Sequence, residues 1–168
     1  MTSVVDNKNF LSPLGFRLIL NRTPNVEYFC QSATLPTVTL PETTQQVTPF
    51  VTIPHPGDHI QYDPLDLRFR VDEDMANYLE IYNWMVGLGF PDNYSQYKVL
   101  SDNNKEKVYS DGTLLILTSN NNASIRVVFE NMFPTSLSPL AFDVTQADIE
   151  YLEATVTMKY RKFYIENI

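Results

Sequence analysis

The sequence predicts a mainly β protein, an antiparallel β-sandwich or barrel with one flanking α-helix, formed by a single domain over residues 1–168. Three observations lead to this fold class. Most patterned segments alternate apolar and polar residues, as strands with one buried face do. Short turn sequences separate several of these segments, which favours antiparallel pairing. Only one segment has apolar residues at helical spacing, so the expected order is four strands, one helix and three strands.

The four expected strands of the first half differ in the strength of their patterns. Gly15–Asn21 alternates clearly, and Val26–Leu35 follows after a bend at Pro24, so these two are expected to form a hairpin. Gln46–Ile53 is a weaker strand within a proline-bounded sequence. Leu65–Asp72 alternates strictly between apolar residues and charged ones. This last pattern is typical of a strand with one buried face and one face in water.

The one expected helix lies in the segment DEDMANYLEIYNWMVGLGFP. Three acidic residues at its start suit the positive end of the helix dipole, and glycines followed by Pro91 end it. A metal site at the three acids is the less favoured interpretation, because no further ligands are spaced to join them. The helix side chains expected to pack against the sheet are those of Tyr78, Leu79, Tyr82, Trp84 and Met85.

The second half begins with a polar segment over residues 93–112, which is expected to be an exposed excursion. Thr113–Ser119 and Ser124–Glu130 flank a short turn and predict a second hairpin. The sequence MFPTSLSPLAF follows and carries more apolar residues than an ordinary loop. It is expected to be a bent crossover that packs on the sheet through Phe133, Leu137, Leu140 and Phe142.

The last expected strand, Glu153–Tyr164, is long and strictly patterned. Apolar and aromatic residues from Ala154 onward share one face, which is expected to join the core. The side chains expected to form its polar face are Thr155, Thr157, Lys159 and Arg161.

Charge and cysteine content exclude several classes of protein. Lys plus Arg number 12 and Asp plus Glu number 20, which gives a net charge of −8. Such a chain is not expected to wrap nucleic acid, because binding needs basic side chains that displace counterions from phosphates. Cys30 is the only cysteine, so an internal disulfide is impossible and a small buried hydrophobe is expected. The absence of a signal-peptide pattern or a membrane-spanning apolar run predicts a cytoplasmic site of synthesis and no membrane insertion.

The two histidines are the nearest approach to site chemistry in the sequence. His55 and His59 have the spacing that binds zinc on a helix, but Pro54, Pro56 and Gly57 exclude a helix there. No phosphate-binding glycine loop, nucleophile elbow or glycosidase-like carboxylate pair is recognisable. The sequence therefore predicts no catalytic site, no cofactor and no metal, and favours a structural or assembly protein.

Residues 36–64 form a proline-rich stretch with β-branched residues throughout. A linker between two domains is one interpretation, but only about 35 residues precede it, too few for a second core. A stiff, extended arm that reaches another subunit is favoured. The arm residues expected to make contacts between subunits are Pro36, Pro41, Pro49, Pro54, His55, Pro56 and His59.

Four stretches in order carry a family resemblance: FRLIL with VEYFCQSATLP, LDLRFRVDEDMANYLEIYNWM, IRVVFENMFPTSLSPLAFD and EATVTMKYRKFYIE. They are similar to four parts of the tail tube proteins of contractile-tailed bacteriophages. These parts are an opening hairpin, a strand with an aromatic helix, a strand with an aromatic-Pro-Thr bend, and a closing strand. The order carries the resemblance more than any single motif, and residues 93–112 depart from the family pattern.

This resemblance implies hexameric rings that stack into a hollow tube within the phage tail of the virion. It implies as partners further copies of the chain, a tail sheath protein outside, and a baseplate initiator and a tail terminator at the ends. DNA would pass through the lumen without specific binding. The arm would mediate ring stacking, and the polar face of the last strand would belong to the tube wall. Acidic and polar side chains are expected to dominate the lumen face, because a negative wall repels phosphates.

Other functions stay open from the sequence. A tube-initiating baseplate protein and a secretion-system-like tube protein would share the same resemblance. A monomeric ligand-binding β-barrel, with a pocket between helix and sheet, belongs to another class. An enzyme that uses the loop of His55 and His59 is a further alternative.

Overall fold

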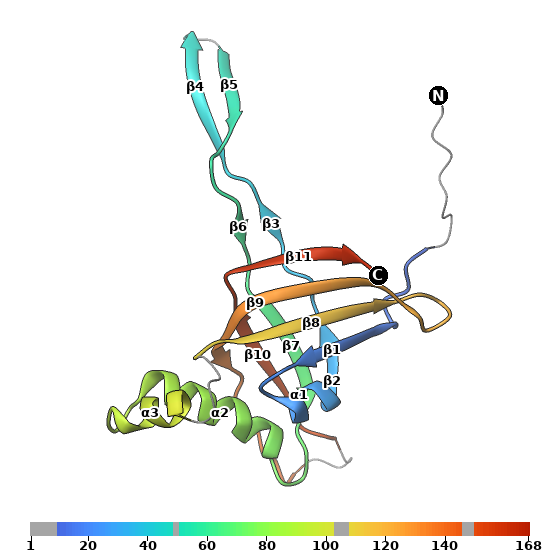
Figure 1. Cartoon of the computed structure of the whole chain (residues 1–168), viewed down its shortest axis with the longest axis vertical. Helices are drawn as coiled ribbons and strands as arrows, with labels where there is room; N and C mark the ends of the chain where they lie inside the picture. Colours follow the sequence, from blue (N-terminus) through green and yellow to red (C-terminus); the bar gives the residue numbers. More distant parts are fainter. Residues whose placement is uncertain (1–9, 49–50, 103–107, 146–149) are drawn as a thin grey trace.

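A seven-stranded antiparallel sheet dominates the computed structural model, which describes residues 10–48, 51–102, 108–145 and 150–168 (Figure 1). Its strands run in the order β1-β8-β9-β10-β7-β2, and β11 also pairs with β9. Their bounds are Phe16–Leu20 (β1), Cys30–Ala33 (β2), Leu65–Arg70 (β7), Ser110–Leu117 (β8), Ala123–Leu137 (β9), Glu153–Lys159 (β10) and Lys162–Asn167 (β11). The mainly β fold class and the predicted hairpin of β8 and β9 are confirmed.

Strand β9 exchanges partners along its length. Its first part lies between β8 and β11, whereas its second part pairs with β10. The exchange occurs around Asn131, whose φ of 54° lies in the left-handed region and whose backbone N–H donates to Asp111 Oδ1 at 2.9 Å. Gly112 lies across this bend, where a Cβ would come 2.6 Å from Met132 Sδ. The bend therefore joins two parts of the sheet around one core.

Alternate residues of the sheet face that core, and β7 shows the pattern most clearly. Leu65, Leu67 and Phe69 are fully buried, and the charged residues between them are exposed, as the strict alternation of the sequence predicts. The remaining buried apolar side chains are those of Leu18, Leu20, Val26, Ile81, Trp84, Leu114, Val127, Phe129, Met132, Ala154, Val156 and Met158.

The predicted helix forms as α2 (Ala76–Gly89) and follows β7 directly. The three acidic residues precede it rather than occupying its first turn, and Met75 at its N-cap has a φ of 55°. Asn77 ties the helix to the strand: its side-chain amide donates to Arg70 O at 2.7 Å, and its Oδ1 accepts from Tyr78 N at 2.8 Å. This fully buried asparagine therefore fixes where the helix leaves the sheet.

The helix side chains singled out from the sequence lie on two different faces. Trp84 is buried, and Tyr78 and Met85 pack against the core. Leu79 and Tyr82 are 45% and 52% exposed, so they do not pack against the sheet. Ile81 occupies the buried position instead, because the interior-facing stripe follows Asn77, Ile81 and Trp84 around the helix.

The segment Val26–Leu35 is not a single strand, contrary to the sequence prediction. Pro24–Phe29 forms a helix, α1, with its proline in the first turn, where a fixed φ suits a helix. Only Cys30–Ala33 is extended, and β2 pairs with β7 while β1 pairs with β8. The predicted hairpin of these two segments is therefore wrong, because each finds its partner far along the chain.

Two further expectations in the second half need correction. One helix was predicted, but a further helix, α3 (Ser95–Asp102), occupies part of the segment 93–112 that was expected to be an exposed excursion, and Tyr97 lies edge-on to Phe90 at 6.2 Å. The last strand is broken at Tyr160 and Arg161, between β10 and β11, so Arg161 does not belong to the polar face of β10. The separation allows β10 and β11 to follow different parts of β9.

The sequence MFPTSLSPLAF continues β9 as far as Leu137 rather than forming a crossover throughout. Phe133, Leu137 and Leu140 pack against the core, as predicted. Phe142 does not, since its side chain is 73% exposed.

The proline-rich arm is a hairpin built in two stages. At its base β3 (Val38–Thr39) pairs with β6 (Gln61–Tyr62), and beyond it β4 (Glu42–Thr48) pairs with β5 (Val51–Pro56). Figure 1 shows the arm projecting away from the sheet along the longest axis of the molecule. The predicted strand Gln46–Ile53 is therefore the end of this hairpin, with residues 49–50 outside the described ranges.

A glycine joins the two stages of the arm. Gly57 N donates to Pro41 O at 2.6 Å, and a Cβ on Gly57 would lie 2.4 Å from that oxygen. No other residue fits at this close approach without moving the backbone.

Candidate functional site: surfaces for assembly

Three strands of the seven-stranded sheet have an edge without a partner strand within the described parts of the chain. β1 pairs only with β8, β2 only with β7, and β11 only with β9. Such edges present unpaired N–H and C=O groups that can bind a strand of another chain. On β11 and just after it, Ile165 and Ile168 are 56% and 68% exposed, so apolar surface accompanies this edge. These edges are the first candidate surfaces for contact between copies.

The arm is the second candidate surface. Pro36 is buried at its base, whereas Pro54, His55, Pro56 and His59 are exposed along it. Pro41 is half-buried beside Gly57, and Pro49 lies outside the described residues. The exposed apolar side chains of the arm are those of Val38, Leu40, Ile53, Ile60 and Tyr62. Exposed apolar side chains gathered on one projecting hairpin favour contact with another protein.

The polar face of β10 forms a cross-strand network with β7. The Thr157 hydroxyl donates to Asp66 Oδ1 at 2.7 Å, and Arg68 pairs with Glu153 at 3.5 Å. Thr155 lies opposite Arg68 in the register of the two strands. These interactions are exposed and of small energetic value, and only the Arg68–Glu153 pair joins opposite charges.

This face is not dominated by acidic side chains. Arg68, Arg70 and Lys159 are its basic members, against Asp66 and Glu153. Arg161 lies beyond the end of β10, where its backbone N–H donates to Glu130 O at 2.9 Å. That acidic and polar side chains dominate the lumen face therefore stays a prediction.

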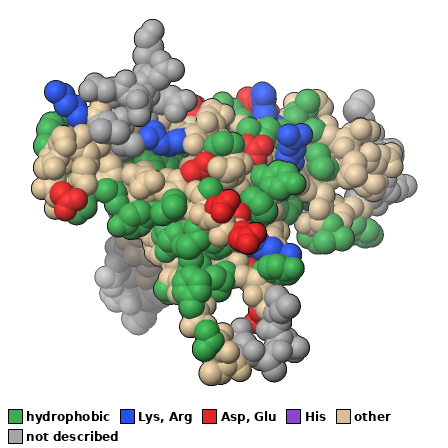
Figure 2. Space-filling view, turned by 90° about the horizontal axis from the view of Figure 1, so that it is seen from below, with side chains coloured by type: hydrophobic (Ala, Val, Ile, Leu, Met, Phe, Trp, Pro, Cys, Tyr) green, Lys and Arg blue, Asp and Glu red, His purple; other side chains and the backbone are tan. Residues whose placement is uncertain are grey.

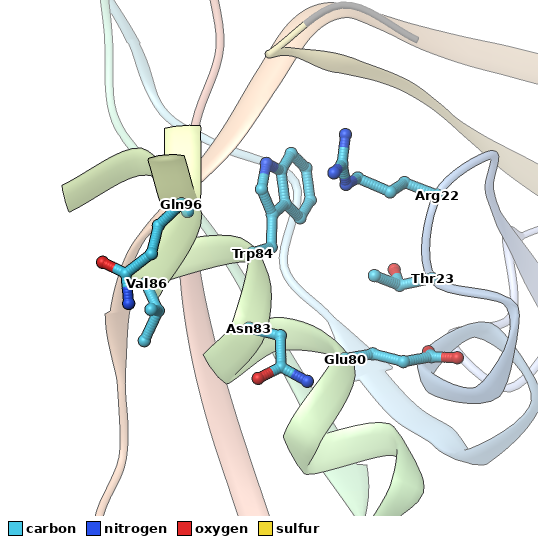
Figure 3. Close-up of a pocket in the computed structure, with 8 residues that line it drawn as sticks. Arg22, Thr23, Glu80, Asn83, Trp84, Val86 and Gln96 are labelled. Atoms are coloured by element: carbon cyan, nitrogen blue, oxygen red, sulfur yellow. The ribbon is translucent and has the colours of Figure 1, made fainter. Parts of the chain in front are cut away.

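A pocket of about 420 Å³ lies between the turn after β1 and helix α2 (Figure 3). The Arg22 guanidinium lies 5.0 Å from the centre of the Trp84 ring, and Trp84 Nε1 donates to Val108 O at 3.1 Å. Thr23 Oγ1 and Glu80 Oε2 are buried there without a hydrogen-bond partner among the described residues. Two unused oxygens in a pocket can accept hydrogen bonds from another chain. The arrangement contains no paired nucleophile and base, and sequence reasoning did not identify it.

Glu80→Gln is expected to stabilise the protein more near neutral pH than near pH 4. Burial raises the pKa of the Glu80 carboxyl, while a hydrogen bond from Asn25 Nδ2 at 2.6 Å opposes the rise. The folded state therefore holds this proton more tightly than the unfolded state, and the associated stability is lost as pH rises through the raised pKa. Glutamine keeps an acceptor for Asn25 and cannot ionise. Thermal unfolding of both proteins at the two pH values measures the effect.

Asp143→Asn is the matched control, because its effect on stability should depend on pH in the opposite direction. Thr145 donates to Asp143 Oδ1 from its hydroxyl at 2.6 Å and its backbone N–H at 2.8 Å, and both bonds lower the pKa of that carboxyl. Stability from Asp143 is present above the pKa of the unfolded state and is lost as pH falls. Asp143→Asn should therefore destabilise the folded protein more at neutral pH than near pH 4. A Glu80→Gln effect that is independent of pH would refute the raised pKa.

Cysteine and histidine chemistry is not organised into a site. Cys30 Sγ donates to Ser32 O at 3.6 Å, and burial raises the pKa of the Cys30 thiol to about 11, so it is neutral at physiological pH. His55 and His59 lie on the exposed arm. Within the ranges that the structure describes, no three His, Cys, Asp or Glu side chains are placed to hold a metal ion, and no helix could cross a membrane.

Comparison with known proteins assigns the family. The profile of the phage tail tube protein family matches residues 13–166. The tail tube terminator protein of Enterobacteria phage T4 is 28% identical over 150 residues, which cover 87% of this chain and 81% of that protein.

Two solved structures share the fold at low sequence identity. A chain in the sheath-tube complex of the extracellular contractile injection system PVC, in its extended state, matches 96% of this chain and 94% of its own length. Its TM-score is 0.65 and its identity is 14%. A chain in the tube terminating cap of the anti-feeding prophage AFP matches 99% of this chain and 97% of its own length, again with a TM-score of 0.65 and 14% identity. This chain therefore belongs to the phage tail tube protein family and is a structural component of a contractile phage tail, as a tube subunit or a tube-end protein.

Proposed function

We propose that this protein is a ring-forming subunit of the tail tube, with hexameric rings stacked around a lumen that conducts DNA. The observation that carries the proposal is the set of unpaired strand edges on β1, β2 and β11. A monomer would leave these edges open to aggregation, whereas closure into a ring covers them. Copies of the same chain are the partners that a closed ring requires.

The arm supports a role in stacking one ring on the next. It projects from the body along the longest axis and exposes apolar side chains on both of its stages (Figure 1). A projecting hairpin of this kind can reach a second ring, while the sheet edges serve contacts within one ring. In this assembly a sheath protein surrounds the tube, a baseplate initiator begins it and DNA crosses it without specific binding.

A position at the end of the tube is the second candidate function. The observation that favours it is the 28% identity to the tail tube terminator protein of phage T4. A terminator would form one ring that closes the tube, whereas a tube subunit would repeat along the whole tail. A tube-initiating baseplate protein would likewise occupy a single position.

Negative-stain electron microscopy of the purified protein tests ring formation. Rings with a central hole are expected, and a monodisperse monomer at high concentration would contradict the proposal. Quantitative mass spectrometry of the virion separates the two functions, because a tube subunit is among the most abundant tail proteins. A copy number equal to one ring would assign the chain to an end of the tube.

A further inference from the structure

A groove of about 630 Å³ opens at the end of the molecule opposite the arm. We call it the end groove, and its apolar lining consists of Phe29, Val71, Met75, Phe142, Tyr151 and Leu152. Phe142 and Tyr151 are 73% and 71% exposed, which is unusual for large aromatic side chains. Figure 2, which views the molecule from below, shows hydrophobic side chains on this end with acidic side chains among them.

The end groove carries an excess of negative charge. Asp72, Glu73 and Glu150 line it, against the single base Arg70. The Arg70 guanidinium lies 5.4 Å from the centre of the Tyr151 ring and forms a cation–π contact with it at the side of the groove. Asp72 Oδ1 is buried without a hydrogen-bond partner among the described residues. An unused buried acceptor within an acidic, apolar groove calls for a partner that brings basic donors together with apolar surface.

The opposite end of the same two strands presents such a surface. We call it the basic corner: Lys159 and Arg161 are exposed there, on either side of Tyr160, which contacts the base of the arm, and Ile60 and Tyr62 are exposed at that base. The Tyr160 hydroxyl donates to Asp63 O at 2.7 Å, and its ring lies 6.1 Å from that of Tyr62, which holds this corner against the arm. Neither Lys159 nor Arg161 forms an ion pair within the described residues.

The register of β7 and β10 places the two surfaces at opposite ends. Glu153 pairs with Arg70 next to the end groove, and Met158 pairs with Leu65 next to the basic corner. Because both surfaces belong to one rigid sheet, a contact between them on different copies orients successive copies in the same direction. Such a head-to-tail contact repeats along an axis when its rotation does not close into a ring.

We propose that the end groove binds the basic corner of a second copy of this chain and that this contact stacks successive rings. Lys159 and Arg161 of one copy would face Asp72, Glu73 and Glu150 of the next, while Ile60 and Tyr62 cover Phe142 and Tyr151. The contact rests on the proposed tube function, for which it supplies the axial surface and the direction of growth.

Two charge-reversed proteins test the contact. Glu73→Lys with Glu150→Lys reverses the end groove, and Lys159→Glu with Arg161→Glu reverses the basic corner. Each protein alone brings like charges together, so its end-to-end association should weaken by roughly tenfold or more. An equimolar mixture should restore association, because each reversed surface then meets an opposite one. Lys98→Glu, an exposed change on α3, is the matched control and should associate like the unaltered protein.

Sedimentation velocity measures end-to-end association, and electron microscopy reports ring formation separately. Circular dichroism checks that each variant folds, and restoration in the mixture excludes misfolding as the cause of any loss. Association of either reversed protein at the unaltered strength would overturn the contact, as would loss without restoration in the mixture. Rings that form in every variant but stack only in complementary pairs support it. Failure of the unaltered chain to form rings would instead count against the proposed tube function, and sedimentation would still test the contact.

Discussion

Phe129→Ala is expected to lower the free energy of unfolding by about 3–5 kcal/mol. Phe129 is fully buried on β9, where that strand lies between β8 and β11. Its ring is 5.1 Å from that of Tyr160 and 5.5 Å from that of Phe163, so the truncation removes contacts with the break between β10 and β11 and with β11 itself. Urea unfolding followed by circular dichroism measures the change, with no large change in the slope expected.

Phe142→Ala provides the matched control for this measurement. It removes the same side chain from a position that is 73% exposed, so the free energy of unfolding should change by less than about 0.5 kcal/mol. Equal losses for the two variants would show that the core is not organised around Phe129. The Phe142 variant also reports on the end groove, because it should reduce association between copies while leaving stability intact.

Excision of the outer arm is expected to leave the fold intact and to abolish stacking of rings. Glu42–Pro56 can be replaced by an Asn-Gly turn between Pro41 and Gly57, because Gly57 N already donates to Pro41 O at 2.6 Å across the joint. Among the side chains that the structure describes, none of the buried apolar ones of the core lies in the excised segment, so the free energy of unfolding should change by less than about 1 kcal/mol. Electron microscopy of both proteins at equal concentration measures the loss of tubes.

His55→Ala with His59→Ala is the control for the excision. It keeps the backbone and apolar side chains of the arm and removes only its histidines, so stacking should persist. If the protein without the outer arm formed tubes of normal length, the arm would not be needed for the stacking of rings. Loss of stacking in the histidine variant would instead show that the two histidine side chains take part in the contact between rings.

Stability and assembly thus depend on different parts of the same strands. The apolar face of β7 and β10 is buried in the core, while the ends of these strands lead to the basic corner and the end groove. A change at an exposed end such as Lys159 should therefore alter association with little effect on folding. This separation is what makes the charge-reversal experiment interpretable.

Local patterns in the sequence were sufficient for several elements. The alternation of Leu65–Asp72 predicted β7 and its buried face, because the period of two determines which side chains face the core. The helical spacing after Asp74 predicted α2, although the choice of face failed for Leu79 and Tyr82. Aromatic side chains such as Tyr82 are amphipathic and occur on either face of a helix. The spacing of apolar and aromatic residues therefore did not show which face of α2 is buried.

The sequence by itself determined the mainly β class, the hairpin of β8 and β9, and a projecting arm, since each depends on neighbours in the chain. Only the tertiary structure decided that β1 pairs with β8 and β2 with β7, that Pro24–Phe29 is helical, and that the last strand breaks at Tyr160. Those choices depend on contacts between residues far apart in the chain, whose energy no local pattern records. The end groove belongs with them, because three separate segments meet there only after the chain has folded.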